Sequence, residues 1–260
     1  MRLTSLGDLL LDVIVRLDEP LVPGDDRMAS ETRVLAGGQA ANVAAWASTL
    51  GADARFVGRR GGDAAGELVT RALQAHGVEV SGPVSGRTGV VVSIASDGDR
   101  TMASDRGSAP DLAPQDLDDS WFDCDVLHLS GYSLLREPIC SAALAAATAA
   151  RGHGALVAVD VSTWSLVDDA FRERLRRLEP DVVFATEREQ DVVGALETRW
   201  VLKRGALGIR VDGVDHPAAA SEVVDTTGAG DALAAGFLVG GAALGLEAAA
   251  HCCARLGAMP

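Results

Sequence analysis

A segment of small residues, Asp225 to Asp231, has the composition of a phosphate-binding turn that leads into a helix. It reads Asp-Thr-Thr-Gly-Ala-Gly-Asp, and the alanine-rich sequence after it predicts a helix. Small side chains leave backbone N–H groups uncovered, so Gly228-Ala229-Gly230 could hold phosphoryl oxygens at the positive end of the helix dipole. Asp231, on the first helical turn, could accept a proton from an attacking hydroxyl. Taken alone, the segment could also be a tight turn with Asp231 as a helix cap.

Two more glycine-rich segments lie in the first third of the chain. Ala36 to Asn42 reads Ala-Gly-Gly-Gln-Ala-Ala-Asn, and Gly58 to Gly66 reads Gly-Arg-Arg-Gly-Gly-Asp-Ala-Ala-Gly. Neither G-x-x-x-x-G-K-[ST] nor the protein-kinase loop set occurs, which excludes both of those kinase classes. With Asp225 to Gly236, the two segments resemble the N-terminal and C-terminal signatures of the PfkB-type carbohydrate kinases, the ribokinase-like family. The resemblance extends from Leu6 to Pro260.

The resemblance implies roles for residues in each signature. It makes Asp231 the catalytic base and Gly228-Ala229-Gly230 the anion hole. Asp12, Gly38 and Asn42 match positions that bind the hydroxyl groups of the acceptor. A carboxylate acceptor beside an amide, which can both donate and accept, suits vicinal hydroxyls.

The resemblance also places the nucleotide and its metal ions. ATP would contact two glycine-containing turns, through Lys203, Gly205, Thr226, Gly228 and Gly230. Glu189 matches a carboxylate that organises Mg²⁺ through water, but Thr186 stands where the family usually has asparagine, and a hydroxyl reaches less far. Asp225 and Thr227 would contribute to a site for a monovalent cation such as K⁺. His251 lies near where relatives hold adenine, although a histidine on a helix surface is the commoner case.

The elements that must position these residues alternate between strand and helix patterns. Strands over 126–129, 156–160 and 182–185, separated by helical segments, predict parallel βαβ units. The fold class expected is a ribokinase-like three-layer α/β sandwich, in one domain over residues 1–260. Residues 13–36 and 89–104 are expected to form a small β-sheet lid, with a hairpin at Asp97-Gly98. In the family such a lid often makes a dimer contact, so a homodimer is expected.

Other elements are predicted around the catalytic segment and at the start of the chain. Residues 3–17 read as a buried strand that runs into an edge strand, and Ser221 to Val224 as a short strand. Two alanine-rich helices, 232–239 and 246–256, would close the chain.

Composition excludes several classes of function. The formal net charge is −14, and no dense basic run is present, so binding to nucleic acid or to an anionic membrane surface is not expected. The four cysteines show no C-x-x-C pair or zinc spacing, which indicates reduced thiols. No leader pattern and no uninterrupted apolar run long enough for a membrane span occur, so a cytoplasmic location is expected.

The function expected is transfer of phosphate from ATP, with magnesium, to a primary hydroxyl of a small sugar or nucleoside. A nucleoside kinase of the adenosine or pseudouridine type, a 2-keto-3-deoxygluconate kinase and a non-catalytic sugar-sensing protein stay open as alternatives. A Rossmann oxidoreductase is excluded because no G-x-G-x-x-G follows the first strand. An anionic acceptor would need a cation and a nucleoside a stacking ring. The candidates are Arg33, Arg59, Arg100 and Arg106 for the cation, and Tyr132 and Trp164 for the ring.

Overall fold

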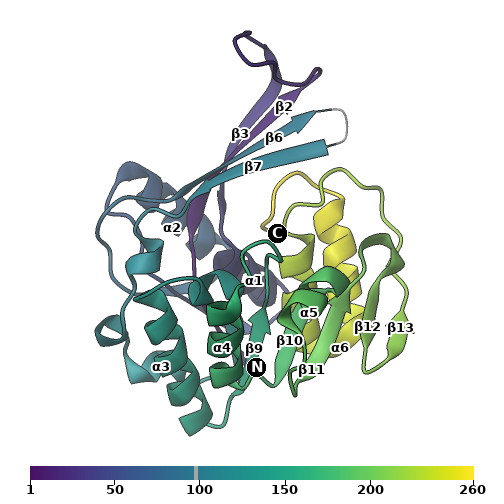
Figure 1. Ribbon diagram of the computed structural model, residues 1–260. Helices are drawn as coiled ribbons and strands as arrows, with labels where there is room; N and C mark the ends of the chain where they lie inside the picture. The colour runs from purple at the N-terminus through teal and green to yellow at the C-terminus, as the bar shows by residue number, and fades with distance from the viewer. Residues whose placement is uncertain (97–98) are drawn as a thin grey trace.

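A nine-stranded sheet forms the centre of the computed structural model, which describes residues 1–96 and 99–260 (Figure 1). Its strands lie in the order β13-β12-β11-β10-β9-β8-β1-β4-β5, and all pairs from β11 to β5 are parallel. The hairpin β12–β13 adds two antiparallel strands at one edge. The strands are β1 (Arg2–Leu6), β4 (Asp53–Val57), β5 (Glu79–Ser81), β8 (Val126–Ser130), β9 (Leu156–Asp160), β10 (Val182–Thr186), β11 (Arg199–Lys203), β12 (Ile209–Val211) and β13 (Val214–His216).

Helices cover both faces of this sheet, as the sequence predicts for a three-layer sandwich. One face packs against α1 (Gln39–Thr49), α2 (Ala64–Ala75) and α6 (Ala229–Cys253). The other packs against α3 (Ile139–Gly152), α4 (Asp169–Leu178) and α5 (Glu187–Val193). Single turns of 3₁₀ helix occur at Ala109–Asp111, Pro114–Asp116, Asp119–Phe122, Gly131–Leu134 and Gly205–Leu207.

Burial on both faces explains why the central strands read as unbroken apolar runs. In β10, Phe184 packs with the α1 and α6 side, whereas its neighbour Val183 packs with the α3 and α4 side. Phe56 and Val57 of β4 divide between the two cores in the same way. The predicted parallel arrangement is therefore confirmed.

A separate four-stranded sheet projects from this body, and it is called the small sheet below (Figure 1). It consists of β2 (Leu10–Leu17), β3 (Ala29–Gly37), β6 (Val90–Ser96) and β7 (Asp99–Asp105), in the order β3-β2-β6-β7. The predicted hairpin at Asp97-Gly98 lies outside the described residues. A buried strand followed by a second strand is confirmed over 3–17, with a break where the chain leaves the central sheet after Leu6 and enters the small sheet at Leu10. The expected edge position of the second strand is wrong, because β2 lies between β3 and β6.

Helix α6 is apolar and long enough, by length and composition alone, to cross a membrane, and it is the one helix in the described residues of which this is true. Half of its most apolar stretch is buried inside the protein. Gly240 and Gly241 have non-helical dihedral angles, which divide α6 into two helical segments as the sequence predicts. Its packing against α1 is that of a core helix.

The segment before α6 differs from the prediction. The strand expected at Ser221 to Val224 is absent from this described part of the chain, and that prediction is wrong. Val224 and Asp225 instead donate backbone hydrogen bonds to the carbonyl of Cys253, at 2.8 and 3.1 Å, so a loop fastens to the end of α6.

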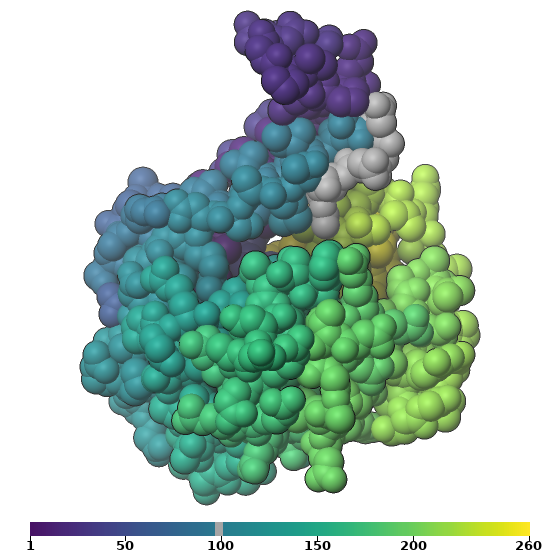
Figure 2. Space-filling model, in the orientation of Figure 1, coloured from purple at the N-terminus to yellow at the C-terminus, as the bar shows by residue number. Residues whose placement is uncertain are grey.

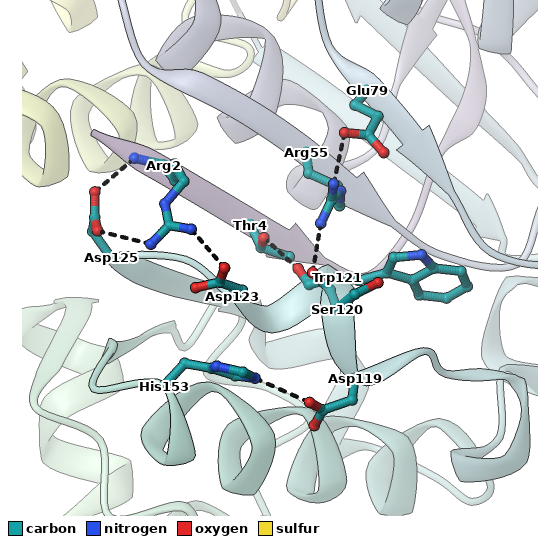
Figure 3. Close-up of polar contacts among 10 residues, drawn as sticks. All are labelled: Arg2, Thr4, Arg55, Glu79, Asp119, Ser120, Trp121, Asp123, Asp125 and His153. Carbon is teal, nitrogen blue, oxygen red and sulfur yellow. Dashed lines mark hydrogen bonds and ion pairs between the residues drawn. The ribbon is translucent and has the colours of Figure 1, made fainter.

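Polar contacts fasten the amino ends of the strands, at the edge of the sheet away from the catalytic segment (Figure 3). The guanidinium of Arg2 lies 2.9 Å from Asp123, and its backbone N–H donates to Asp125 at 2.8 Å. Arg55 joins β4 to β5 through Glu79 at 2.7 Å. Exposed ion pairs of this kind each contribute only about 0–1 kcal/mol, so they align strands more than they stabilise the fold.

Asp63 joins α2 to the base of the small sheet. Its carboxylate caps α2 by accepting the N–H of Gly66 at 2.8 Å, and it also accepts both the N–H and the hydroxyl of Thr88, just before β6. These bonds hold the pKa of Asp63 below its usual value, with the Thr88 hydroxyl as the largest cause.

We expect Asp63→Ala to lower the free energy of unfolding by about 0.5–2 kcal/mol, the usual effect of removing an N-cap. Because the folded-state pKa of this carboxylate is depressed, its contribution is present at neutral pH and is lost as the pH falls below about 4. Urea denaturation at pH 7 and at pH 3 measures both effects. Glu67→Ala, on the exposed face of the same helix, is the control, and an equal loss in both variants would contradict the role of Asp63.

Candidate active site

The residues expected to do chemistry gather where the parallel strands end. Asp8 follows β1, Asp160 ends β9, Thr186 ends β10 and Lys203 ends β11. Carboxyl ends of parallel strands share one edge of a sheet, which is where open α/β sheets bind ligands. The small sheet overhangs this edge, and Figure 2 shows the hollow between it and the body.

The first turn of α6 lies at this edge, with Gly228 as its N-cap residue. Gly228 has a φ of 78°, which other residues rarely adopt, and a Cβ there would lie 2.6 Å from the Cα of Ala258. Both the backbone angle and the close contact therefore require glycine. The N–H groups of a first helical turn have no partner within the helix. Gly228-Ala229-Gly230 therefore offers a compact cradle for an anion.

Asp231 lies on this turn, partly buried, and receives a side-chain hydrogen bond from the signature of the first third. Nδ2 of Asn42 donates to its Oδ2 at 2.7 Å. Burial raises the pKa of Asp231 to about 7, with Asp160 adding to the rise, while Asn42 opposes it. A carboxyl that titrates near neutral pH is suited to accept a proton from a hydroxyl.

Asn42 leaves one polar atom for a ligand. Its Oδ1 is buried and has no hydrogen-bond partner among the described residues. Buried polar atoms are rarely unpaired in proteins, and an unpaired one at a functional site calls for an explanation. A substrate hydroxyl that donates to Oδ1 would supply the missing bond.

A pocket of about 230 Å³ lies between the small sheet and the body, and it contains the expected acceptor-binding residues. Asp12, Gly38, Asn42 and Asp231 all line it, and Val91 and Met102 of the small sheet form another part of its wall. The structure thus brings together residues that are up to 219 positions apart in the sequence.

A second pocket of about 500 Å³ lies on the other side of the same turn. Ala229 and Gly230 line it, together with the turn after β11 and small apolar residues of α6. It contains the expected nucleotide-binding residues Lys203, Gly205, Thr226 and Gly230, whereas Gly228 lines the acceptor pocket.

Lys203 is mostly buried, and its ammonium is paired rather than solvated at the end of its strand. Its Nζ donates to both carboxylate oxygens of Asp160, at 2.8 and 2.9 Å. Burial opposes the charge of Lys203, but Asp160 and then Glu189 hold its pKa above the usual value.

Glu189 forms a capping box with Thr186 at the start of α5. Its carboxylate accepts the N–H of Thr186 at 2.7 Å, and its own N–H donates to the Thr186 hydroxyl at 3.2 Å. Glu189 is 5% exposed and lines neither pocket. In the described part of the chain, no cluster of three His, Cys, Asp or Glu side chains could hold a metal ion. The magnesium role of Glu189 stays a prediction.

Asp225 organises the loop before α6. One oxygen accepts the N–H and the hydroxyl of Thr227, at 2.9 and 2.6 Å, and the other accepts the N–H of Gly257 at 3.1 Å. The carboxylate thus ties the loop to the C-terminal segment, and the expected cation site at Asp225 and Thr227 stays a prediction.

Sequence reasoning missed a polar network at the junction of the two pockets. Oε1 of Gln39 accepts the hydroxyls of Ser130 and Ser162, at 2.5 and 2.6 Å, and the N–H of Ser162 donates to Asp160 at 3.0 Å. Gln39 lies within the N-terminal signature segment, Ala36 to Asn42, so the sequence could have indicated a role for it at the site. The partnership of Asp160 with Lys203, 43 residues apart, has no local sequence pattern.

Several candidates lie elsewhere. His251 contacts Trp46 edge-on, at 5.8 Å between ring centroids, and does not line the nucleotide pocket. Trp164 is covered by the guanidinium of Arg188 and does not line the acceptor pocket, whereas Tyr132 does.

Comparisons with known proteins agree with this geometry. The sequence profile described as pfkB family carbohydrate kinase matches residues 2–259. The chain belongs to this family. It is 31% identical to an ATP-dependent ribose-1-phosphate kinase of Halopiger xanaduensis, over 92% of the chain and 84% of the relative, and 31% identical to a fructokinase of Escherichia coli, over 93% and 85%.

Solved structures of the same fold include an adenosine kinase from Sinorhizobium meliloti. It superposes with a TM-score of 0.87 at 26% identity and covers all of the chain and 95% of that structure. The pfkB-family chain is therefore an ATP-dependent carbohydrate kinase of the ribokinase-like fold, as the sequence predicts.

Proposed function

We propose that the protein transfers the γ-phosphoryl group of ATP to a primary hydroxyl of a monosaccharide-sized acceptor, with Asp231 as the catalytic base. The observation that carries this proposal is the position of one backbone turn between two pockets. Asp231 lines the smaller pocket, and Gly230 lines the larger one. A phosphoryl group held at the turn would have the nucleotide on one side and an acceptor on the other.

In the proposed reaction the acceptor oxygen forms a bond to the γ-phosphorus while the bond to the bridging oxygen of ADP breaks. The hydroxyl proton moves to the carboxylate of Asp231, and ADP leaves with the electrons of the broken bond. The turn formed by Gly228-Ala229-Gly230 stabilises charge on the transferring oxygens through its N–H groups. Asp12, Gly38 and Asn42 orient the acceptor, and the small sheet acts as a lid that excludes water.

In the proposal, magnesium is held mainly by the nucleotide. Mg²⁺ in such sites keeps several waters and uses one or two carboxylates plus substrate phosphates. Glu189 is the carboxylate that would act through water, and the ion would neutralise phosphate charge. K⁺ near Asp225 and Thr227 belongs to the proposal as well.

The acceptor is proposed to be a monosaccharide because the pocket is small. A volume of about 230 Å³ lies below the roughly 300–1,000 Å³ of pockets that enclose drug-sized ligands. Of the candidate cations, Arg106 lines this pocket, but its guanidinium binds both oxygens of Asp8 and the carbonyl of Tyr132. That pairing favours a neutral acceptor over a sugar acid or sugar phosphate.

The other candidate cations give no support for an anionic acceptor. Arg33 and Arg59 pair with Glu31 and Asp116 and do not line the pocket. The side chain of Arg100 lies outside the described part.

A coupled assay of ADP release against pentoses, hexoses, keto-acids and nucleosides tests the proposal. We expect the highest kcat/KM with a neutral monosaccharide. Release of ADP with nucleosides alone would favour the nucleoside-kinase alternative, for which Tyr132 in the pocket wall is the supporting observation. Binding of a sugar by calorimetry with no ADP release at any magnesium concentration would favour the sugar-sensing alternative.

Asp12→Ala should raise the KM for the acceptor by about tenfold or more and change kcat less. A hydroxyl partner removed from a buried pocket costs about 1–3 kcal/mol of binding. Steady-state kinetics with the best acceptor measures the change, and Asp53→Ala, at the opposite edge of the sheet, is the control. An unchanged KM for every acceptor would remove Asp12 from the site.

Two substitutions at the capping box test the role of Glu189. Thr186→Asn keeps a good N-cap and restores the family's usual amide, so it should lower the magnesium concentration needed for half-maximal rate. Glu189→Gln keeps the capping box but removes the charge, so it should raise that concentration. Glu173→Gln on α4 is the control for loss of one carboxylate. Identical magnesium dependence in the wild-type protein and all three variants would contradict the magnesium role of Glu189.

The homodimer expected from the resemblance is part of the proposal. Its support is the exposure of Val34 on the edge strand β3 and of Met28 just before it, 51% and 92%. Light scattering that gives the mass of one chain at micromolar concentration would contradict it.

A further inference from the structure

Lys203 is the single lysine in a chain that contains 22 arginines. Most surface ion pairs in the described residues use arginine, as at Arg2, Arg87 and Arg210. Arginine and lysine are not equivalent, because guanidinium is a planar fork and ammonium is a compact charge with three donors. The single lysine therefore places a compact cation at a position where an arginine would place a planar one.

The surroundings of the Lys203 ammonium leave one donor available. Two of its N–H groups bind the oxygens of Asp160, which is 1% exposed, and within the described residues no third partner is present. Asp160 is held in turn by the N–H of Ser162. The ammonium therefore has a fixed position and one unused N–H.

That position is beside the anion cradle. A Cβ on Gly230 would lie 3.7 Å from both Nζ and Cδ of Lys203. Lys203 and Gly230 also line the nucleotide pocket together. A group held by the N–H groups of the first turn of α6 would thus meet the ammonium as well.

We propose that Lys203 is a catalytic residue whose ammonium binds the oxygens of the transferring phosphoryl group, and that Asp160 is the residue that positions it. The proposal rests on the proposed function and adds a protein cation to it. During transfer the proton of the acceptor goes to Asp231, whereas Lys203 keeps its own proton and contributes only charge and a hydrogen bond. A cation in this place supplements magnesium, because Glu189 is engaged in its capping box.

A planar guanidinium fits this place less well than an ammonium. A fork that binds both oxygens of Asp160 points its remaining donors in the same plane, whereas the third N–H of an ammonium points away from the carboxylate. Lys203→Arg should therefore keep the ion pair and fold normally but lose most of the rate.

Chemical labelling tests the contact without any acceptor. An acyl phosphate of ATP is a mixed anhydride with a carbonyl carbon next to the γ-phosphate. A nearby lysine that has given one proton to water attacks that carbon, so that an amide bond forms, the bond between the carbonyl carbon and the phosphate oxygen breaks, and ATP leaves. We expect mass spectrometry to find the amide on Lys203 and to find it suppressed by excess ATP. The amino-terminal amine is the internal control for non-specific reaction. Amide on the amino terminus alone would overturn the proposal.

Kinetics of a single and a double variant separates catalysis from folding. Lys203→Met should lower kcat by about 10²- to 10³-fold, the usual effect of removing one hydrogen-bond donor to the transition state. The Kd for ADP should change less than about threefold. The substitution should also lower Tm, because Asp160 is left buried and unpaired. The double variant Lys203→Met/Asp160→Asn should recover Tm but not kcat.

The outcomes distinguish the two proposals. A double variant that regains the wild-type kcat would show that Lys203 has only a structural role and would overturn the inference. Arg210→Met, which removes one exposed cation outside both pockets, should keep the wild-type rate. If the wild-type protein releases no ADP with any acceptor, the proposed function fails, and labelling of Lys203 still decides whether the ammonium meets the nucleotide phosphates.

Discussion

Asp231→Asn should lower kcat by about 10²- to 10⁴-fold, the range for loss of a general base, and leave acceptor binding nearly unchanged. The substitution keeps the shape of the side chain and removes the group that accepts the proton. In the wild-type protein, kcat/KM should fall about tenfold per pH unit below about 7, because burial raises the pKa of Asp231 to about 7.

The same substitution should raise stability. The folded-state pKa of Asp231 lies above the value of about 3.9 for an unfolded chain. The contribution of the protonated side chain to stability is therefore fully present below about pH 4 and is lost as the pH rises to about 7. Asp231→Asn should therefore have a higher Tm than wild type at pH 8, and the difference should shrink as the pH falls toward 4.

Rate measurements and thermal denaturation at pH 5 to 8 check both statements. Asp111→Asn, at an exposed ion pair with Arg136, is the control. A wild-type rate in the Asp231 variant would show that another group accepts the proton. An unchanged Tm at pH 8 would show that the charged carboxylate of Asp231 does not destabilise the folded protein.

Gly228→Ala should have the second largest effect, a loss of roughly 10² or more in kcat together with a lower Tm. The backbone at Gly228 has a φ of 78°, which strains any other residue, and the new Cβ would lie 2.6 Å from Cα and Cβ of Ala258. The first turn of α6 must therefore shift, and the N–H groups that hold the phosphoryl group shift with it. Loss of one such donor alone costs about 10²- to 10³-fold.

The chain offers a matched control for this variant. Gly213, in the turn between β12 and β13, has a φ of 79° but no atom within 4 Å of the Cβ position. Gly213→Ala carries the same backbone strain without the collision, so it should lose some stability and keep the wild-type rate. Equal kcat values in the two variants would mean that the exact position of the turn is unimportant.

Local sequence patterns predicted the helices and strands well where a single pattern, such as an apolar run, determines the element. The buried strands β8, β9 and β10 and the helices between them follow from apolar runs that alternate with helical periodicity. The capping box at Thr186 and Glu189 also follows a local pattern, a hydroxyl residue followed three positions later by glutamate. The resemblance implies a magnesium role for Glu189, which the capping box itself does not require.

The strand predicted at Ser221 to Val224 shows how a local rule fails. Val223 and Val224 are β-branched and apolar, which favours a strand, yet they are 63% and 47% exposed. Val223 lines the nucleotide pocket instead of packing into a core. Apolar residues that serve a ligand cannot be told from apolar residues of a core by pattern alone.

The signatures predicted residues that lie together around one pocket, but they did not predict how side chains pair. Asp12, Gly38, Asn42 and Asp231 do line one pocket. The partners of Lys203 and Arg106 depend on which strand ends are neighbours, because Asp160 and Asp8 are 43 and 98 residues away. Only the order of strands in the sheet brings these pairs together.

The two pockets draw on separate parts of the gene, and this division has a consequence for how the family can change. All lining residues of the nucleotide pocket lie between 203 and 253, whereas those of the acceptor pocket come from 8–162 and from the single turn 227–231. Under the proposed function, mutation in the first 162 codons can therefore change the acceptor pocket and leave the lining of the nucleotide pocket unchanged. Exchange of that part between relatives, joined after β9, is a direct route to hybrid enzymes with altered acceptors.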